Sequence, residues 1–191
     1  RAVATDADGN QSEEVVVPVW MDDWSWEQAV LYHALIDRVA NGDSSNDATV
    51  GSSHAITDFA GGDLAGLTAA LPYLDSLGVN AIWISNPQPA PANAWPGDCG
   101  ASFSGFHGFW PVSWDGVDSR LGTEAEWRSF IAAAHGRNMR VVMDWVGNQV
   151  HVDHPLFSTW PEDAFNPIAV CSETDRHGVS NWDSQPESCW F

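Results

Sequence analysis

The sequence has 191 residues, of which 26 are acidic and 7 are basic, so its formal net charge is −19. Nucleic acids and anionic membrane surfaces require a Lys/Arg-rich partner, and this charge excludes both. Hydrophobic residues make up 44% of the chain, which is enough for a packed core. No apolar run approaches the ~18 residues of a membrane span.

Tryptophan is unusually abundant, with 12 Trp against 2 Tyr. Indole faces stack on pyranose rings, so this excess suits a sugar-binding protein, although we assign at least half of these rings to packing. An acidic, Lys-poor, Trp-rich composition indicates an exported protein, in which disulfides are permitted. Cys171 and Cys189 could pair, which would leave Cys99 free or paired outside this sequence.

The chain opens on Arg1 without an initiating Met or an apolar leader, and it stops at Trp190-Phe191. We therefore expect a fragment of a longer protein. Residues 1–19 are predicted to be the last strand of an upstream β-sandwich domain, with a turn at Asp8-Gly9 and a strand over 14–17. Residues 20–28 are predicted to be a linker.

Strand and helix patterns then alternate. Apolar runs predict strands over 29–35, 79–85 and 140–146, and the second is apolar enough to be buried on both faces. Leucines at helical spacing predict a helix over 64–77, with Asp63 as its N-cap. A second helix begins at the capping box of Thr123 and Glu126 and ends at Gly136. No regular period follows residue 147.

This alternation indicates an α/β fold built from right-handed βαβ units with a parallel sheet. In such folds ligands bind at the carboxyl ends of the strands. Functional residues are therefore expected just after 35, 85 and 146. Three groups of polar and aromatic residues follow those points.

The first group is a polar loop with side-chain oxygens and glycines, which suits Ca²⁺ because this ion takes 6–8 oxygen ligands. A solvated turn is the alternative, since the same residue types form loops. The residues concerned are Asn41, Asp43, Asn46, Asp47, Gly61 and Asp63.

The second group, Phe106-His107-Gly108-Phe109-Trp110, would give a sugar a face to stack on and a ring nitrogen to bind. Taken alone, a core aromatic cluster is the favoured interpretation. The third is Asp144 to Gln149 at the end of the third strand. An Asp inside an apolar strand is costly unless it is paired or functional, so here we favour function over a turn.

Taken together, these groups resemble the α-amylase family, glycoside hydrolase family 13, including its cyclodextrin glucanotransferases. Five segments match in order across residues 29–155, which makes an unrelated α/β domain improbable. They are Ile36–Asp43 (the Asp-Arg-Phe segment), GGDLAGL at 61–67, GVNAIWISNP at 78–87, FHGFWP at 106–111 (Tyr-His-Gly-Tyr-Trp) and DWVGNQ at 144–149 (Asp-x-Val-x-Asn-His).

The resemblance implies a partial (β/α)8 TIM barrel over residues 29–150, holding about strands one to three. Residues 151–191 would begin the domain inserted after strand three. It also implies that the six loop residues listed above bind Ca²⁺, Gly61 through its carbonyl, and that Asn148 binds a second Ca²⁺. His107, Phe109, Trp110, Asp144 and Gln149 would form the sugar site.

Two departures from the family are relevant to function. Phe106 and Phe109 replace Tyr, and Gln149 replaces a His that contacts the sugar, so a hydroxyl and a titratable group are lost. No segment resembles the one that carries the family's nucleophile, so we assign no catalytic residue to this chain and expect it to be inactive alone. The parent would be a secreted, calcium-dependent, retaining enzyme acting on α-glucans. A non-catalytic carbohydrate-binding or assembly module is the alternative.

Overall fold

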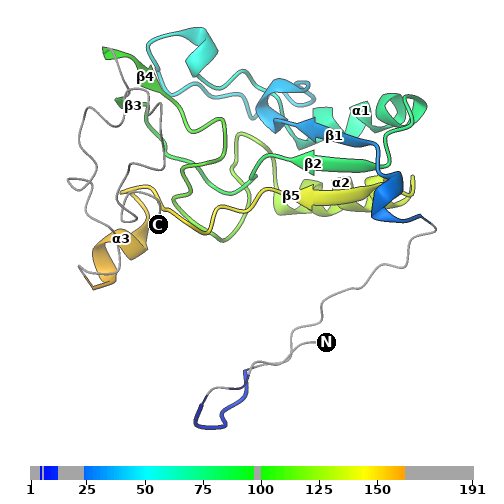
Figure 1. Ribbon diagram of the computed structural model, residues 1–191. Helices are drawn as coiled ribbons and strands as arrows, with labels where there is room; N and C mark the ends of the chain where they lie inside the picture. The colour runs from blue at the N-terminus through cyan, green and yellow to red at the C-terminus, as the bar shows by residue number, and fades with distance from the viewer. Residues whose placement is uncertain (1–4, 6, 13–23, 97–99, 162–191) are drawn as a thin grey trace, which may run out of the picture.

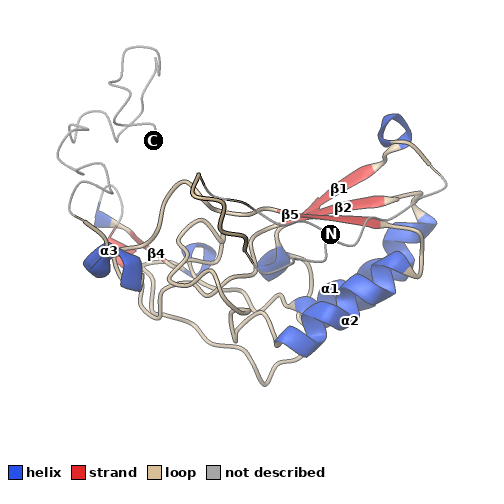
Figure 2. Cartoon of the chain, turned by 90° about the horizontal axis from the view of Figure 1, so that it is seen from below, coloured by secondary structure: helices blue, strands red, loops and turns tan. Residues whose placement is uncertain are grey.

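A computed structural model describes residue 5 and residues 7–12, 24–96 and 100–161 (Figure 1). Its centre is a parallel sheet in the order β1 (Leu31–Ala34), β2 (Ala81–Ile84) and β5 (Arg140–Met143). Helices α1 (Leu64–Ser76) and α2 (Glu124–His135) connect the strands, and both lie on one face of the sheet (Figure 2). This confirms the predicted strand–helix alternation.

The remaining elements are short and lie outside the sheet. A hairpin of β3 (Trp95–Pro96) and β4 (Ser102–Phe103) interrupts the long loop after β2, and α3 (Pro155–Thr159) follows β5. Three short 3-10 helices are η1 (Trp26–Gln28), η2 (Ile36–Arg38) and η3 (Ala55–Thr57). The hairpin and α3 were not predicted, because elements of two to five residues carry no measurable period.

Both long helices begin where the sequence predicts. The Asp63 carboxylate caps α1 by accepting the N–H of Gly66, and Thr123 and Glu126 form the capping box of α2. Gly78, with a φ of +80°, lies just beyond α1. The two helices pack on the sheet through a single apolar core. Its members are Ala34, Ile36, Leu64, Leu67, Leu71, Leu74, Val79, Ile82, Ile84, Leu121, Phe130, Ala134 and Met139.

The expectation that the second strand is buried on both faces is wrong for the described part of the chain. Ile82 and Ile84 point towards the helices and are fully buried, whereas Trp83 points to the other face and is 39% exposed. The physical reason is that α1 and α2 cover only one face of the sheet (Figure 2). The third strand is also shorter than predicted, so Asp144 follows β5 instead of lying within it.

Two tryptophans hold the start of this unit against the sheet. The guanidinium of Arg140 on β5 lies 3.7 Å from the ring centre of Trp24 and 4.5 Å from that of Trp26. It also donates to the carbonyl of Trp24, whose indole N–H donates to the carbonyl of Asn138. Residues 24–28, part of the predicted linker, therefore pack at the N-terminal end of β5.

Several predictions fall wholly or partly on residues that the structure does not describe. Thr5 and Gln11 form an antiparallel bridge around Gly9, as the turn predicts, but the strand over 14–17 lies outside the described residues. The same holds for Cys99, Cys171 and Cys189 and for residues 162–191 of the inserted domain. The division into domains therefore stays a prediction. None of the helices described is long and apolar enough to cross a membrane.

The loop between β1 and α1 is organised by a buried carboxylate, that of Asp58. Burial alone would raise its pKa, but four backbone N–H donors lower the pKa below the ordinary value of 3.8. The donors are those of Val50, Gly51, Ser52 and Phe59, at 2.8–3.0 Å. The carboxylate therefore closes a loop that contains no long element of its own.

Replacing Asp58 with Asn should lower the free energy of unfolding at neutral pH by about 1–3 kcal/mol, because a neutral amide accepts these N–H groups more weakly. Since the folded-state pKa lies below 3.8, the stabilisation is present above that pH and is lost as the pH falls through the folded-state pKa. Urea unfolding of both proteins across this range should show their stabilities converging in acid. A difference that is independent of pH would contradict this account of the loop.

Candidate functional site

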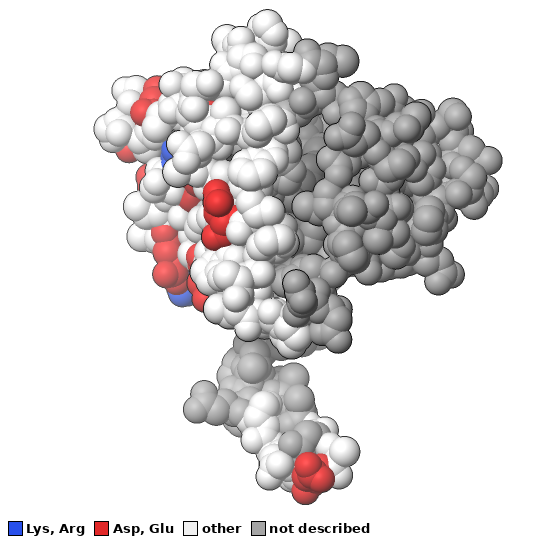
Figure 3. All heavy atoms as spheres, turned by 90° about the vertical axis from the view of Figure 1, so that its left-hand side faces the viewer, with Lys and Arg blue, Asp and Glu red and all other residues white. Residues whose placement is uncertain are grey.

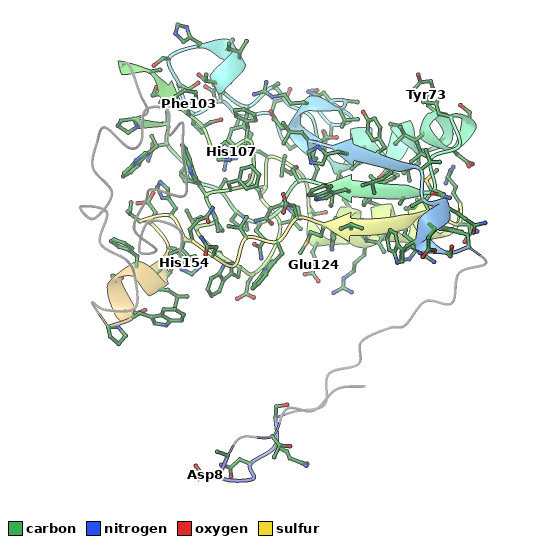
Figure 4. All side chains as sticks on the ribbon, viewed as in Figure 1. Asp8, Tyr73, Phe103, His107, Glu124 and His154 are labelled. Atoms are coloured by element: carbon green, nitrogen blue, oxygen red, sulfur yellow. The ribbon has the colours of Figure 1, made fainter. Side chains whose placement is uncertain are left out.

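The candidate site lies at the carboxyl ends of the three strands, where the long loops gather (Figure 4). Ser85 and Asn86 follow β2 directly and are buried. The Ser85 hydroxyl accepts the N–H of Ile36, which joins the ends of β1 and β2. The Asn86 amide donates to the carbonyl of Gly108, 22 residues along the chain. The end of β2 thereby fixes the segment that carries His107.

His107 is held in one orientation by its neighbours. Its Nδ1 accepts the N–H of Phe109 at 3.0 Å, so the neutral ring carries its proton on Nε2. The ring stacks against Phe109 with a centroid distance of 5.5 Å and meets Trp110 edge-on at 4.7 Å. Burial lowers the pKa of His107 below its usual value of 6.5. At neutral pH the group is therefore an uncharged hydrogen-bond donor.

The backbone at Gly108 makes this placement possible. Its φ is +83°, and a Cβ there would lie 2.7 Å from the carbonyl oxygen of Asn86. Any other residue would both strain the backbone and push the loop away from β2. The glycine thus lets His107 and Phe109, two residues apart, lie with their rings stacked. Phe109 remains 47% exposed and offers a face to a ligand.

The residues after β5 meet this cluster from the neighbouring strand. The side-chain amide of Gln149 donates to the carbonyl of Phe109 at 3.1 Å, and that of Asn148 donates to Gln149. The backbone N–H of Asp144 donates to the carbonyl of Ile84, which places Asp144 beside the end of β2. The structure therefore brings Gln149 to the backbone of Phe109, beside His107 in the chain. It shows Gln149 bound to the protein itself.

Arg38, on η2 after β1, links the site to the loop below it. Its guanidinium lies 3.9 Å from the ring centre of Phe106, which in turn meets His107 edge-on at 5.5 Å. The same group donates to the carbonyls of Ile56 and Asp58 and pairs with Asp37. From the sequence, Arg38 was named only as part of a motif. Its stacking on Phe106 was not predicted, because the two residues are 68 positions apart in the chain.

The six polar loop residues also come together. Asp63 accepts the N–H groups of Gly42 and Asp43, and the Asn46 amide lies 3.5 Å from it. The Asn41 amide bonds both oxygens of Asp47 at 2.8 Å. A Cβ on Gly61 would lie 2.6 Å from Asp47 Oδ1 and 2.8 Å from Asn41 Nδ2. The loop is therefore packed around these oxygens.

One of these oxygens is left without a partner. Asn46 Oδ1 is buried and accepts no hydrogen bond from the described residues, which is costly unless something else binds it. Asp63 is occupied by backbone N–H groups, and no cluster of three His, Cys, Asp or Glu side chains suited to a metal is found in the part of the chain described. A cation here would depend on amide, carbonyl and carboxylate oxygens without any His or Cys, a ligand set that is typical of Ca²⁺ and not of Zn²⁺. The residues present fit calcium on that ground.

Sequence reasoning missed the groups that support the site. The Asp118 carboxylate accepts the N–H of Ala90 and pairs with Arg120, and Arg120 stacks on Phe59 at 4.0 Å. His151, buried after β5, contacts the rings of Trp95 and Trp110. An Asp and an Arg two residues apart, or a single His, occur in any surface loop, so the sequence carries no signal for them.

The chain is similar to known proteins both in sequence and in structure. Residues 31–169 match the family model for the alpha amylase catalytic domain. The periplasmic alpha-amylase of Escherichia coli (strain K12) is 33% identical over 180 residues, covering 87% of this chain and 26% of that protein. A cyclomaltodextrin glucanotransferase of Klebsiella oxytoca is 30% identical over 173 residues, covering 83% of this chain and 26% of that protein. An Anoxybacillus alpha-amylase structure superposes with a TM-score of 0.63 at 29% identity, covering 76% of this chain and 30% of that one.

The parallel sheet with its helices is therefore part of a TIM barrel of the glycoside hydrolase class. The chain belongs to the α-amylase family, which confirms the resemblance seen in its five motifs. It spans about a quarter of the length of these two curated relatives.

Gly61→Ala should destabilise the protein by more than the backbone strain alone. The residue has a φ of +88°, and the new Cβ would collide with the Asp47 and Asn41 side chains. Gly51→Ala is the matched control, because Gly51 has a φ of +74° and no atom within 4 Å of the added Cβ. We expect the two losses of unfolding free energy, measured by urea titration, to differ by about 1–2 kcal/mol. Equal losses would show that Asp47 and Asn41 move aside freely.

Proposed function

We propose that this chain forms part of an exported, calcium-dependent enzyme that hydrolyses or transfers α-glucans. The observation that carries the proposal is the arrangement of His107 and Phe109. An Nε2–H donor that bonds to none of the described residues lies beside an exposed aromatic face at the carboxyl ends of parallel strands. A pyranose presents the matching features, an apolar face edged by hydroxyls. Among the related proteins are alpha-amylases and cyclomaltodextrin glucanotransferases.

The reaction would be a double displacement with retention of configuration. Such enzymes use two carboxyl groups about 5–5.5 Å apart, one as nucleophile and one as acid and base. We assign neither role to this chain, and propose that both groups come from sequence outside it, so that the chain alone is inactive. His107, Phe109, Trp110, Asp144 and Gln149 would bind and orient the sugar.

Calcium would hold the loop beneath this site. Asn41, Asp43, Asn46 and Asp47 would bind the ion with the Gly61 carbonyl, and Asn46 Oδ1 would gain the partner that it lacks. Asp63 would act mainly by fixing the loop to the start of α1. Asn148 would belong to a second calcium site whose other ligands lie outside the described residues. The structural effect would reach His107 through Arg38 and Phe106.

A non-catalytic binding module is the second candidate, and the bonding of Gln149 favours it. The family's His at this position is replaced by an amide that is already bound to the Phe109 carbonyl. A protein that binds α-glucans without turning them over would fit this arrangement. Turnover of starch by a full-length protein carrying this chain would exclude the module; saturable binding without turnover would support it.

Calcium should raise the melting temperature of a protein carrying this chain, and the double variant Asp43→Ala, Asp47→Ala should lose most of that shift. The reason is that two carboxylates of the proposed site are removed. Thermal unfolding with calcium and with excess chelator measures the effect, and isothermal titration measures the affinity. Because the proposed second calcium site could also raise the melting temperature, the test compares the calcium-induced shift of the double variant with that of the wild-type protein. Asp75→Ala and Asp115→Ala, two exposed carboxylates elsewhere, are the controls. An unchanged shift in the double variant would remove calcium from this loop.

His107→Ala should lower kcat/KM on an α-glucan by at least ~10-fold, about 1.4 kcal/mol, with little change in melting temperature. The cause is the loss of the Nε2–H donor to the sugar. His54→Ala is the control, because His54 is exposed and its ring caps nothing. A large loss of stability, with activity following the folded fraction, would make His107 a core residue instead. Gln149→His, in turn, should alter the pH profile by restoring a titratable group.

A further inference from the structure

We propose that Trp95 is a second sugar-stacking platform, which extends the site at His107 to longer α-glucan chains. The inference rests on the proposed function, since it names a further part of the same site. Trp95 lies on β3, in the hairpin of the loop that follows β2, and its side chain is 41% exposed. An indole exposed to that extent on a strand of two residues makes little contribution to a core. A ligand-binding role explains why it is presented at the surface.

A continuous row of rings connects Trp95 to His107. Trp95 meets His151 edge-on at a centroid distance of 4.7 Å, and His151 lies 6.0 Å from Trp110. Trp110 meets His107 at 4.7 Å. Three successive ring contacts therefore join Trp95 to the imidazole of His107, which is proposed to bind the sugar and lies 12 residues further along the chain. A glucan held at His107 and Phe109 could continue along this row.

Hydrogen bonds hold β4, the strand that pairs with the strand of Trp95. The backbone of Ser53 donates to the carbonyl of Ser102, the Ser53 hydroxyl accepts the N–H of Ser102, and Thr57 Oγ1 also donates to the Ser102 carbonyl. These bonds join the hairpin to the loop that the Asp58 carboxylate organises. A stacking surface fixed in advance loses little conformational entropy when it binds a ligand. The hairpin is therefore suited to binding rather than to opening and closing.

His151 supplies an independent sign of a missing partner. Its Nδ1 accepts the N–H of Asp153, so the neutral ring carries its proton on Nε2. That Nε2 is buried, has no hydrogen-bond partner within the described residues, and belongs to a ring in contact with both Trp95 and Trp110. A hydroxyl bound against these two indoles would supply the acceptor. Burial lowers the pKa of His151, although Asp153 opposes the shift, so the ring remains a neutral donor at neutral pH.

The end of the molecule that carries β3 and β4 has a charge that suits a neutral ligand. Figure 3 shows that the described part of this face carries few charged groups, and most of those visible are acidic. With a net charge of −19, the protein would repel an anionic polymer. A neutral polyhydroxylated chain meets no such repulsion. An α-glucan longer than the segment held at His107 is the ligand that fits both the rings and the charge.

The test compares a short and a long ligand in a full-length protein that carries this chain. Isothermal titration with maltotriose and maltoheptaose should show Trp95→Ala weakening maltoheptaose at least about fivefold, the size expected for one stacked ring, and leaving maltotriose unchanged. Trp95→Phe should retain part of the affinity, because a phenyl ring still stacks. Trp26→Ala is the matched control, since Trp26 is exposed at the opposite end of the sheet. Melting temperatures verify that each variant folds.

The outcomes separate this inference from the proposed function. Equal affinities of wild-type and Trp95→Ala protein for maltoheptaose would overturn the platform, and so would an equal loss in Trp26→Ala. A loss of the same size for both ligands would place Trp95 within the His107 subsite and also overturn the extension. Turnover is measured separately. If the wild-type protein turns over no α-glucan, and Trp95→Ala still weakens the binding of maltoheptaose but not of maltotriose, the proposed enzyme activity is refuted and the platform is supported.

Discussion

Buried carboxylates that accept backbone N–H groups hold the loop between β1 and α1, and the site above the sheet depends on that loop. Asp37, Asp58 and Asp63 are each less than 6% exposed and each accepts at least two backbone N–H donors. Charged acceptors satisfy donors more strongly than neutral ones, so a few side chains order the 29 residues from 35 to 63, which contain no long helix or strand. Burial sets a limit on this strategy, because it raises the pKa of Asp37 to about 6.

Arg38 connects that loop to the rings of Phe106 and His107. It compensates the Asp37 charge, binds two carbonyls of the loop and stacks on Phe106. Its position explains how a change in the loop, including the binding of an ion, could alter the orientation of His107 without touching a sugar. Because the pKa of Asp37 is raised from 3.8 to about 6 in the folded protein, its ionisation lowers the free energy of unfolding progressively as the pH rises between these two values. The pKa of Asp58 is shifted the other way, so its ionisation raises the free energy of unfolding. The Asp58 and Asp37 contributions to stability therefore change in opposite directions with pH, and Arg38 offsets part of the Asp37 cost.

The parts of the fold that were predictable are those in which local chemistry and packing agree. Leucine spacing, the Asp63 cap and the capping box of Thr123 and Glu126 each specify the same helix ends that the structure shows. The proximity of Gln149 to Phe109 was predictable because the ends of neighbouring strands in a parallel sheet lie close together, whatever the loops do between them. Trp95 and His151 could not be predicted, since their contact joins two loops that are 56 residues apart and have no period. The open face at Trp83 was misjudged because apolar composition does not say whether a covering layer lies within the chain.

Two residues of the candidate site, His107 and Gln149, are uncharged at neutral pH. Burial keeps His107 uncharged at neutral pH, and Gln149 has no charge to lose. The wall that this chain contributes therefore offers hydrogen-bond donors and aromatic faces without a net positive charge. Under the proposed function, such a wall would bind the hydroxyls of a neutral sugar without attracting carboxylates or phosphates. Under the proposed function, the pair of carboxyl groups that cleaves the glycosidic bond would come from sequence outside this chain and would face this wall.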